Sequence, residues 1–121
     1  MNDIQLGVIE SRFADMIWER EPVSSTELVK AAEKEFGWKR TTTHTVIKRL
    51  CEKGLFLNDG GTVRALISRD EFLARRGEQF VTENYDGSLP AFVAAFTKRR
   101  RLSEEEALEI QRLIDESRRK E

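Results

Sequence analysis

The stretch WKRTTTHTVIKRLCEKGL, residues 38–55, decides the fold of this chain. Four residues within it lie at i, i+3, i+4 and i+7, the spacing of one buried helix face: Thr43, Val46, Ile47 and Leu50. Gly54 is placed to end that helix. Four of the residues 41–45 are threonines, which rank well below alanine as helix formers. We therefore interpret this helix as one selected for what its exposed face contacts.

Two further helices are expected before this stretch. The first ends before Pro22, because proline disfavours helix in the residue that precedes it. Its apolar residues have mostly helical spacing: Ile4, Val8, Phe13, Ile17 and Trp18. The second can be capped by Ser24 or Ser25, with Glu27 at capping-box distance from Ser24, and Gly37 stops it.

A β-hairpin is expected directly after the third helix. Asp59-Gly60 lies between two short β-prone runs, LFLN and TVRALI, which is a strong hairpin signal. A two-stranded hairpin is not stable alone, so it must pack on the helices. Residues 1–68 therefore predict a winged helix-turn-helix domain, and the fold class is mostly α with a small β-hairpin.

Residues 69–121 read as three more helices that form a helical dimerisation region. Ser68 can cap the first of them, and Ser103 with Glu106 makes a capping box for the last. The helices are short and one-sided, so their apolar faces need a partner, and a two-fold homodimer is the commonest solution. The alternative is that they pack back onto the first domain. The expected dimer residues are Phe72, Phe80, Leu89, Phe92, Val93, Phe96, Ile110, Leu113 and Ile114.

The exposed side of the third helix is the candidate DNA-binding surface. With the apolar side buried, Thr42, Thr45 and Arg49 line the opposite side, because they are three and four residues apart. Thr41, His44 and Lys48 flank that line. Threonine can meet a phosphate, a base edge or a thymine methyl, and arginine can fork onto guanine.

Charge supports a polyanion partner only modestly. The net charge is −1, but residues 38–69 carry seven basic residues against two acidic ones, a local balance of +5. Lys48, Lys53 and Arg64 are expected to contact phosphates, which position a protein without specifying sequence. A solvated charged surface is the simpler interpretation, and winged helices also serve as protein-interaction modules that do not bind DNA.

The sequence offers few residues for catalysis or metal binding. His44 is the single histidine and Cys51 the single cysteine, so no catalytic pair, disulfide or thiolate metal cluster forms within one chain. We expect no enzyme, no metal and no cofactor. No apolar run is long enough to span a membrane, so a cytoplasmic protein without membrane insertion is expected.

The chain resembles the family of penicillinase and methicillin-resistance repressors and copper-responsive repressors (BlaI/MecI/CopY type). Four stretches carry the resemblance, which covers almost the whole chain: MIWEREPVSSTELV (16–29), WKRTTTHTVIKRLCEKGL (38–55), FVTENYDGSLPAFVAAF (80–96) and LSEEEALEIQRLIDE (102–116). The resemblance implies a homodimeric repressor that binds an operator dyad in double-stranded DNA. Its register places DNA contacts on Thr41, Thr42, His44, Thr45 and Arg49.

The chain also departs from the family pattern. Lys39 and Arg40 stand where the family has a serine cap and often a proline, while Thr41 and His44 replace cationic residues. The short wing, NDGGTVRA, lacks the tyrosines and the basic tip of the family. Resistance-type members are cut by a membrane sensor protease at an Asn-Phe bond, and the register here gives Gln79-Phe80 as the candidate bond. The cysteine-rich tail of copper-responsive members is absent, which excludes copper sensing by that route.

Overall fold

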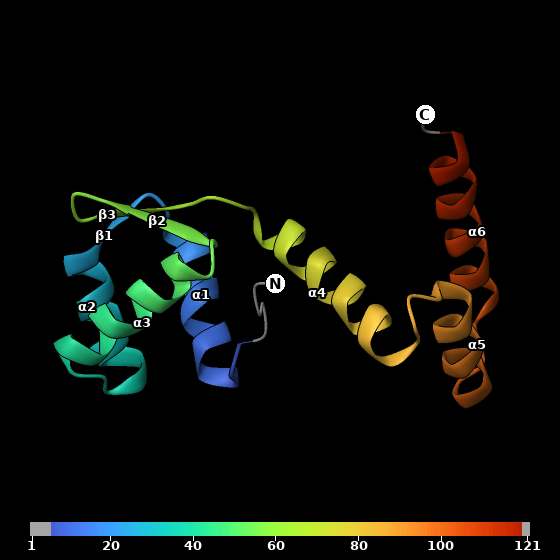
Figure 1. Ribbon diagram of the computed structural model, residues 1–121, viewed down its shortest axis with the longest axis horizontal. Helices are drawn as coiled ribbons and strands as arrows, with labels where there is room; N and C mark the ends of the chain where they lie inside the picture. The colour runs from blue at the N-terminus through green and yellow to red at the C-terminus, as the bar shows by residue number, and fades with distance from the viewer. Residues whose placement is uncertain (1–5, 120–121) are drawn as a thin grey trace. The chain divides into compact units, whose positions relative to one another are not determined.

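A computed structural model describes residues 6–119 of the chain, so Ile4 lies outside the described residues. Figure 1 shows helices joined to a small sheet, in agreement with the predicted fold class. The elements are α1 (Val8–Arg20), β1 (Val23–Ser24), α2 (Ser25–Phe36), α3 (Arg40–Glu52), β2 (Phe56–Asp59), β3 (Thr62–Ala65), α4 (Arg69–Asn84), α5 (Leu89–Arg99) and α6 (Glu104–Arg119).

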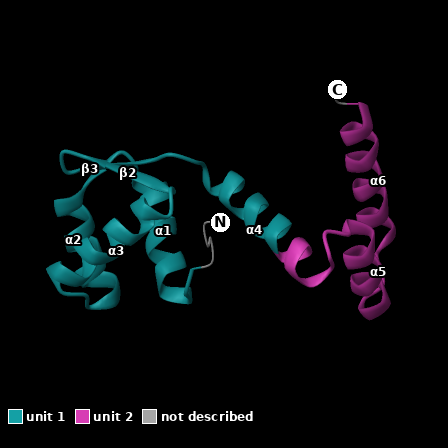
Figure 2. Cartoon of the chain, viewed as in Figure 1, with its two compact units in different colours: residues 1–79 teal, residues 80–121 magenta. Residues whose placement is uncertain are grey.

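The chain forms two compact units, residues 1–79 and residues 80–121 (Figure 2). The sequence pattern places the boundary before α4, whereas the contacts divide within that helix. The first unit therefore includes the winged helix together with most of α4. The second unit contains the end of α4 with α5 and α6.

The predicted caps define several helix ends. The Ser24 hydroxyl accepts a hydrogen bond of 3.0 Å from the Glu27 N–H, which caps α2. Gly37 ends the same helix with φ 70°, a left-handed conformation that glycine adopts without a steric penalty. At the start of α6, the Ser103 hydroxyl and the Glu106 carboxylate exchange hydrogen bonds with each other's backbone N–H. These capping predictions are confirmed.

The sheet has three antiparallel strands in the order β1-β3-β2, one more than the predicted hairpin. Asp59 pairs with Thr62 across a two-residue turn, Gly60-Gly61, in which both residues have positive φ. Such a turn matches the twist of the flanking strands, and it confirms the predicted hairpin. The third strand, β1, pairs Val23 with Val63. Two residues are too few to show a periodic signal, so sequence reasoning missed β1.

The first unit has one apolar core, to which each of its helices contributes. Its largest fully enclosed apolar side chains are Phe13, Ile17, Leu28, Ile47, Leu50, Leu55, Phe56 and Val63. Phe72 of α4 joins this core with only 2 % of its surface exposed, and its ring centroid lies 5.4 Å from that of Trp18. The assignment of Phe72 to a surface between copies is therefore wrong, because the chain's own first unit covers it.

The second unit is built differently. Four rings meet within it, those of Phe80, Tyr85, Phe92 and Phe96, with centroids 5.5–6.2 Å apart between neighbours. None of its described side chains is buried. Large apolar side chains remain exposed on each of its helices: Phe80, Leu89, Val93, Phe96, Leu108, Ile110, Leu113 and Ile114. The second unit thus has apolar faces but no enclosed core of its own.

Candidate nucleic-acid interface

Helix α3 faces in the predicted direction. Thr43, Val46, Ile47 and Leu50 are buried. The opposite side is exposed at Thr41, Thr42, Thr45, Lys48 and Arg49, and we call these residues the outward face of α3. His44 is half-buried at the edge of this face. Packing of the apolar side in the core therefore stabilises this threonine-rich helix, and its polar side stays exposed to solvent.

The amino-terminal end of α3 is electropositive. Its first turn contains no acidic residue, and the N-cap residue Lys39 makes no side-chain cap hydrogen bond. Arg40 begins the helix, so two cationic side chains add to the positive end of the helix dipole. The hydroxyl of Thr43 turns inward and donates to the Lys39 carbonyl oxygen at 3.4 Å. This end of the helix favours anions such as phosphate.

One residue of the outward face is held by another helix. Arg49 donates from Nη1 to Oε2 of Glu10, in the first turn of α1. The Arg49 side chain is 50 % exposed, whereas that of Glu10 is only 19 % exposed. Burial raises the pKa of the Glu10 carboxyl, but hydrogen bonds from Arg49 and from the Gly7 N–H outweigh it, so the pKa is lowered. Sequence reasoning missed Glu10, because no local signal links residues this far apart in the chain.

The two remaining predicted phosphate contacts lie outside the outward face. Lys53 is the C-cap residue of α3 and is half-buried, and its charge acts on Glu10. Arg64 is exposed on β3, where it pairs with Leu57 of β2. The structure therefore gathers five candidates on one helix side and places Arg64 on the wing.

The candidate cleavage bond lies inside a helix. Gln79 and Phe80 are both part of α4, where Gln79 is half-buried and Phe80 is exposed. The boundary between the two compact units falls between these same residues.

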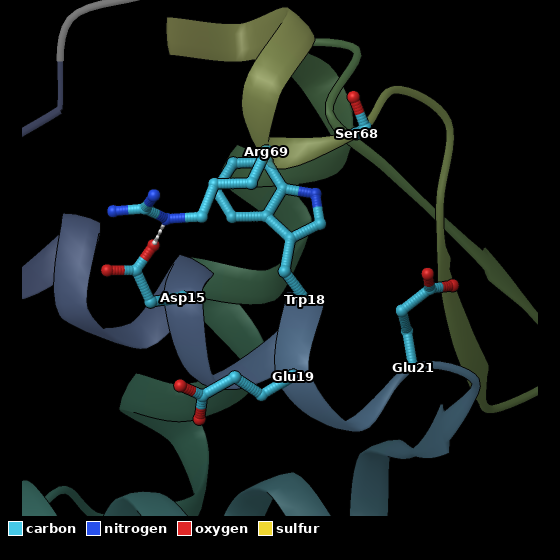
Figure 3. A pocket seen from close by; sticks show the side chains of 6 residues that line it. All are labelled: Asp15, Trp18, Glu19, Glu21, Ser68 and Arg69. Atoms are coloured by element: carbon cyan, nitrogen blue, oxygen red, sulfur yellow. Dashed lines mark hydrogen bonds and ion pairs between the residues drawn. The ribbon is translucent and has the colours of Figure 1, made fainter.

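A surface pocket of about 490 Å³ lies on the first unit, between α1 and the start of α4 (Figure 3). Its lining residues are Asp15, Trp18, Glu19, Glu21, Ser68 and Arg69. Several of its polar groups already have partners: Arg69 Nε donates to Asp15 at 2.8 Å, and Trp18 Nε1 donates to the Ile67 carbonyl oxygen at 3.0 Å. The pocket therefore resembles a structural junction more than a reaction site.

The remaining candidate groups show no catalytic arrangement. Burial raises the pKa of the Cys51 thiol, which lowers its thiolate content and so its reactivity. Within residues 6–119, no cluster of three or more His, Cys, Asp or Glu side chains is arranged to hold a metal ion. None of the helices in that range is both long and apolar enough to cross a bilayer.

Comparison with known proteins agrees with this geometry. The family model described as penicillinase repressor matches residues 6–116. The chain is 27 % identical over 117 residues to the penicillinase repressor of Bacillus licheniformis, covering 93 % of this chain and 91 % of that one. It is 21 % identical over 115 residues to the methicillin resistance regulatory protein MecI of Staphylococcus aureus, covering 92 % and 94 %. A threonine-rich helix exposed on a winged helix, and a family match over nearly the full length, lead to one conclusion: the chain belongs to the penicillinase repressor family of DNA-binding transcriptional regulators.

Proposed function

We propose that this chain is a homodimeric transcriptional repressor that places α3 of each copy in the major groove of a pseudo-palindromic operator. The observation that carries the proposal is the outward face of α3, exposed on a helix whose other side is anchored in the core. Residues near the start of a recognition helix are those that reach base edges. Membership of a repressor family supports the same function.

The side chains of this face have the chemistry that DNA recognition needs. Thr42 and Thr45 offer hydroxyls to base edges and methyls to thymine, and Arg49 offers paired donors to guanine. Lys48, Lys53 and Arg64 would neutralise phosphates and set the register of the protein on the duplex. The electropositive start of α3 would add to the phosphate contacts. The threonines and Arg49 would therefore read the base sequence, whereas the cationic groups would position the protein on the phosphate backbone.

The second unit supports a dimer. Its described side chains enclose no core, while six of the predicted dimer residues of α5 and α6 remain exposed: Leu89, Val93, Phe96, Ile110, Leu113 and Ile114. A second copy of the same surface would cover them, which is the usual two-fold arrangement. A dimer would contact two half-sites roughly 10 base pairs apart, or a multiple of that distance.

Inactivation is proposed to follow from cleavage of the Gln79-Phe80 bond by a membrane sensor protease acting in the cytoplasm. A protease binds its substrate in an extended form, so α4 must open locally before this bond can be cut. The exposed side chain of Phe80 is consistent with recognition at this position.

Selection from a pool of randomised DNA duplexes tests the proposed function. We expect the full chain to enrich a sequence with two related half-sites and to shift it as a dimer in a gel. With six phosphate contacts, the affinity should fall by about a thousandfold between roughly 50 and 200 mM salt. If the protein enriches no sequence and shifts no duplex at the lower salt concentration, it is a protein-interaction module instead.

A further inference from the structure

Glu10 is a carboxylate fixed beside the outward face of α3. Its Oε1 accepts a hydrogen bond of 3.4 Å from the N–H of Gly7, the N-cap residue of α1. Its Oε2 accepts from Nη1 of Arg49. Because the first turn of α1 holds one oxygen and most of the side chain is covered, the second oxygen has a defined position.

Arg49 would be mobile without this contact. An arginine on an exposed helix surface samples many rotamers, and ordering them on binding costs free energy. The ion pair restricts the guanidinium while using only Nη1. A guanidinium has five N–H donors, and within residues 6–119 the others of Arg49 make no hydrogen bond to the protein. These donors are enough for a two-bond contact with O6 and N7 of guanine.

We propose that Glu10 is a positioning residue that directs Arg49 to a base edge, an inference that rests on the proposed DNA-binding function. Glu10 also carries a negative charge close to the surface that DNA phosphates would approach. It therefore opposes binding to any duplex, while it orders Arg49 for the correct one. Glu10 thus increases the difference between specific and non-specific affinity instead of the affinity itself.

The test measures two affinities for each protein. One probe is the duplex that the wild-type chain enriches from a randomised pool, and the other is an unrelated duplex of equal length. For Glu10→Gln, the affinity for the unrelated duplex should rise, and the salt slope should steepen by about 0.9 because Arg49 is freed to neutralise one phosphate. The ratio of specific to non-specific affinity should fall about tenfold.

A second substitution separates charge from geometry. Glu10→Asp keeps the negative charge but shortens the side chain, so the ion pair with Arg49 is lost or displaced. For this variant, the specificity ratio should fall while the salt slope stays at the wild-type value. A wild-type ratio for both Glu10→Asp and Glu10→Gln would overturn the proposal.

A double-mutant cycle shows whether Glu10 acts through Arg49. In an Arg49→Ala background, Glu10→Gln should leave the specificity ratio unchanged. An equal fall in both backgrounds would overturn the proposal, since Glu10 would then act by another route. A wild-type chain that selects no sequence at all would refute the proposed function as well.

The matched control is Glu35→Gln. Glu35 forms an ion pair of 3.3 Å with Arg12, between α2 and α1. The substitution changes the net charge of the first unit by the same amount, and it should leave the specificity ratio unchanged. Glu10→Gln keeps an oxygen that can accept from the Gly7 N–H, so the cap of α1 is preserved, and thermal unfolding of each variant verifies this.

Discussion

The indole Nε1 of Trp18 donates a hydrogen bond of 3.0 Å to the carbonyl oxygen of Ile67, which lies just before α4. The same ring has its centroid 5.0 Å from that of Phe56 and 5.4 Å from that of Phe72. Trp18 thus ties α1 both to the backbone that leads into α4 and to the first turn of that helix. This contact makes the start of α4 a part of the first unit.

Replacing Trp18 by phenylalanine should lower the free energy of unfolding by about 2 kcal/mol, because a partly buried carbonyl loses its donor and the ring loses contacts. Urea unfolding followed by circular dichroism measures this change. Trp38→Phe is the control, since the Trp38 ring packs on Phe13 and Phe36 but its indole makes no hydrogen bond within residues 6–119. Equal losses for the two variants would show that the hydrogen bond contributes nothing.

Threonine and lysine on α3 should affect DNA binding in different ways. Thr45→Ala should alter the base preference at one or two positions and cost about 1 kcal/mol with the selected duplex. Lys48→Ala should weaken binding to every duplex alike and reduce the salt slope by about 1. Both side chains are exposed, so each substitution should change the free energy of unfolding by less than about 0.5 kcal/mol. If Thr45→Ala instead weakens binding to every duplex equally, Thr45 contacts a phosphate and not a base.

The apolar stripe of α6 should hold two copies together. Ile114→Glu places a charge where a second copy would bury an apolar side chain, so we expect a monomer by light scattering and at least about tenfold weaker binding to the selected duplex. Phe92 is a less informative position, because it is half-buried among rings of its own unit.

Leu108→Glu is the matched control for that experiment. Leu108 is 65 % exposed and lies roughly 120° around the helix from Ile114, six residues away at 100° each. The variant should remain a dimer. If Ile114→Glu is also a dimer, α6 does not form the interface.

Gly77 should make α4 easier to open near the candidate cleavage bond. It is in the interior of the helix, and apart from its two chain neighbours and the nearby backbone of α4, no atom lies within 4 Å of the position that a Cβ would occupy. Gly77→Ala should therefore stabilise α4 by about 0.5–1 kcal/mol and slow chymotrypsin cleavage after Phe80 about threefold, since the open form becomes rarer. Ala74→Gly should have the opposite effect. Unchanged cleavage in both variants would mean that opening of α4 does not limit the rate.

Acid should weaken the start of α6. The Arg100 guanidinium, together with the Ser103 N–H, lowers the pKa of Glu106 from 4.5 to about 2. A lowered pKa in the folded state means that the ionised carboxylate adds stability above pH 4.5, and that this stability is lost as the pH falls toward 2. The difference in unfolding free energy between the wild type and Glu106→Gln should therefore shrink over that range. A difference that is constant with pH would contradict this assignment.

The sequence predicts the elements whose signals are local. The apolar spacing through Leu50 defines the inward side of α3, and Gly37 and the Asp59-Gly60 pair mark a helix end and a turn. The exposed candidates on α3 followed from the same spacing, because a helix repeats its faces over a few residues. These features depend on neighbours within one or two turns.

The features that the sequence did not predict depend on distant residues. Glu10 and Arg49 are 39 positions apart, and Val23 pairs with Val63 across a similar separation. An apolar pattern shows that Phe72 is buried, but it does not show against which surface. The missed Glu10-Arg49 pair and the wrong assignment of Phe72 therefore have one cause: periodicity reports the orientation of a side chain and not the identity of what it meets.

Every buried apolar side chain among residues 6–119 lies between Phe13 and Phe72. A cut within α4 after Gln79 would therefore remove no part of the core, and the amino-terminal product should remain a folded domain with α3 intact. Such a cut would disconnect the two halves of the protein without denaturing the first. Release from the operator after cleavage would then result from a loss of avidity. A high concentration of the amino-terminal fragment should partly restore occupancy of the operator.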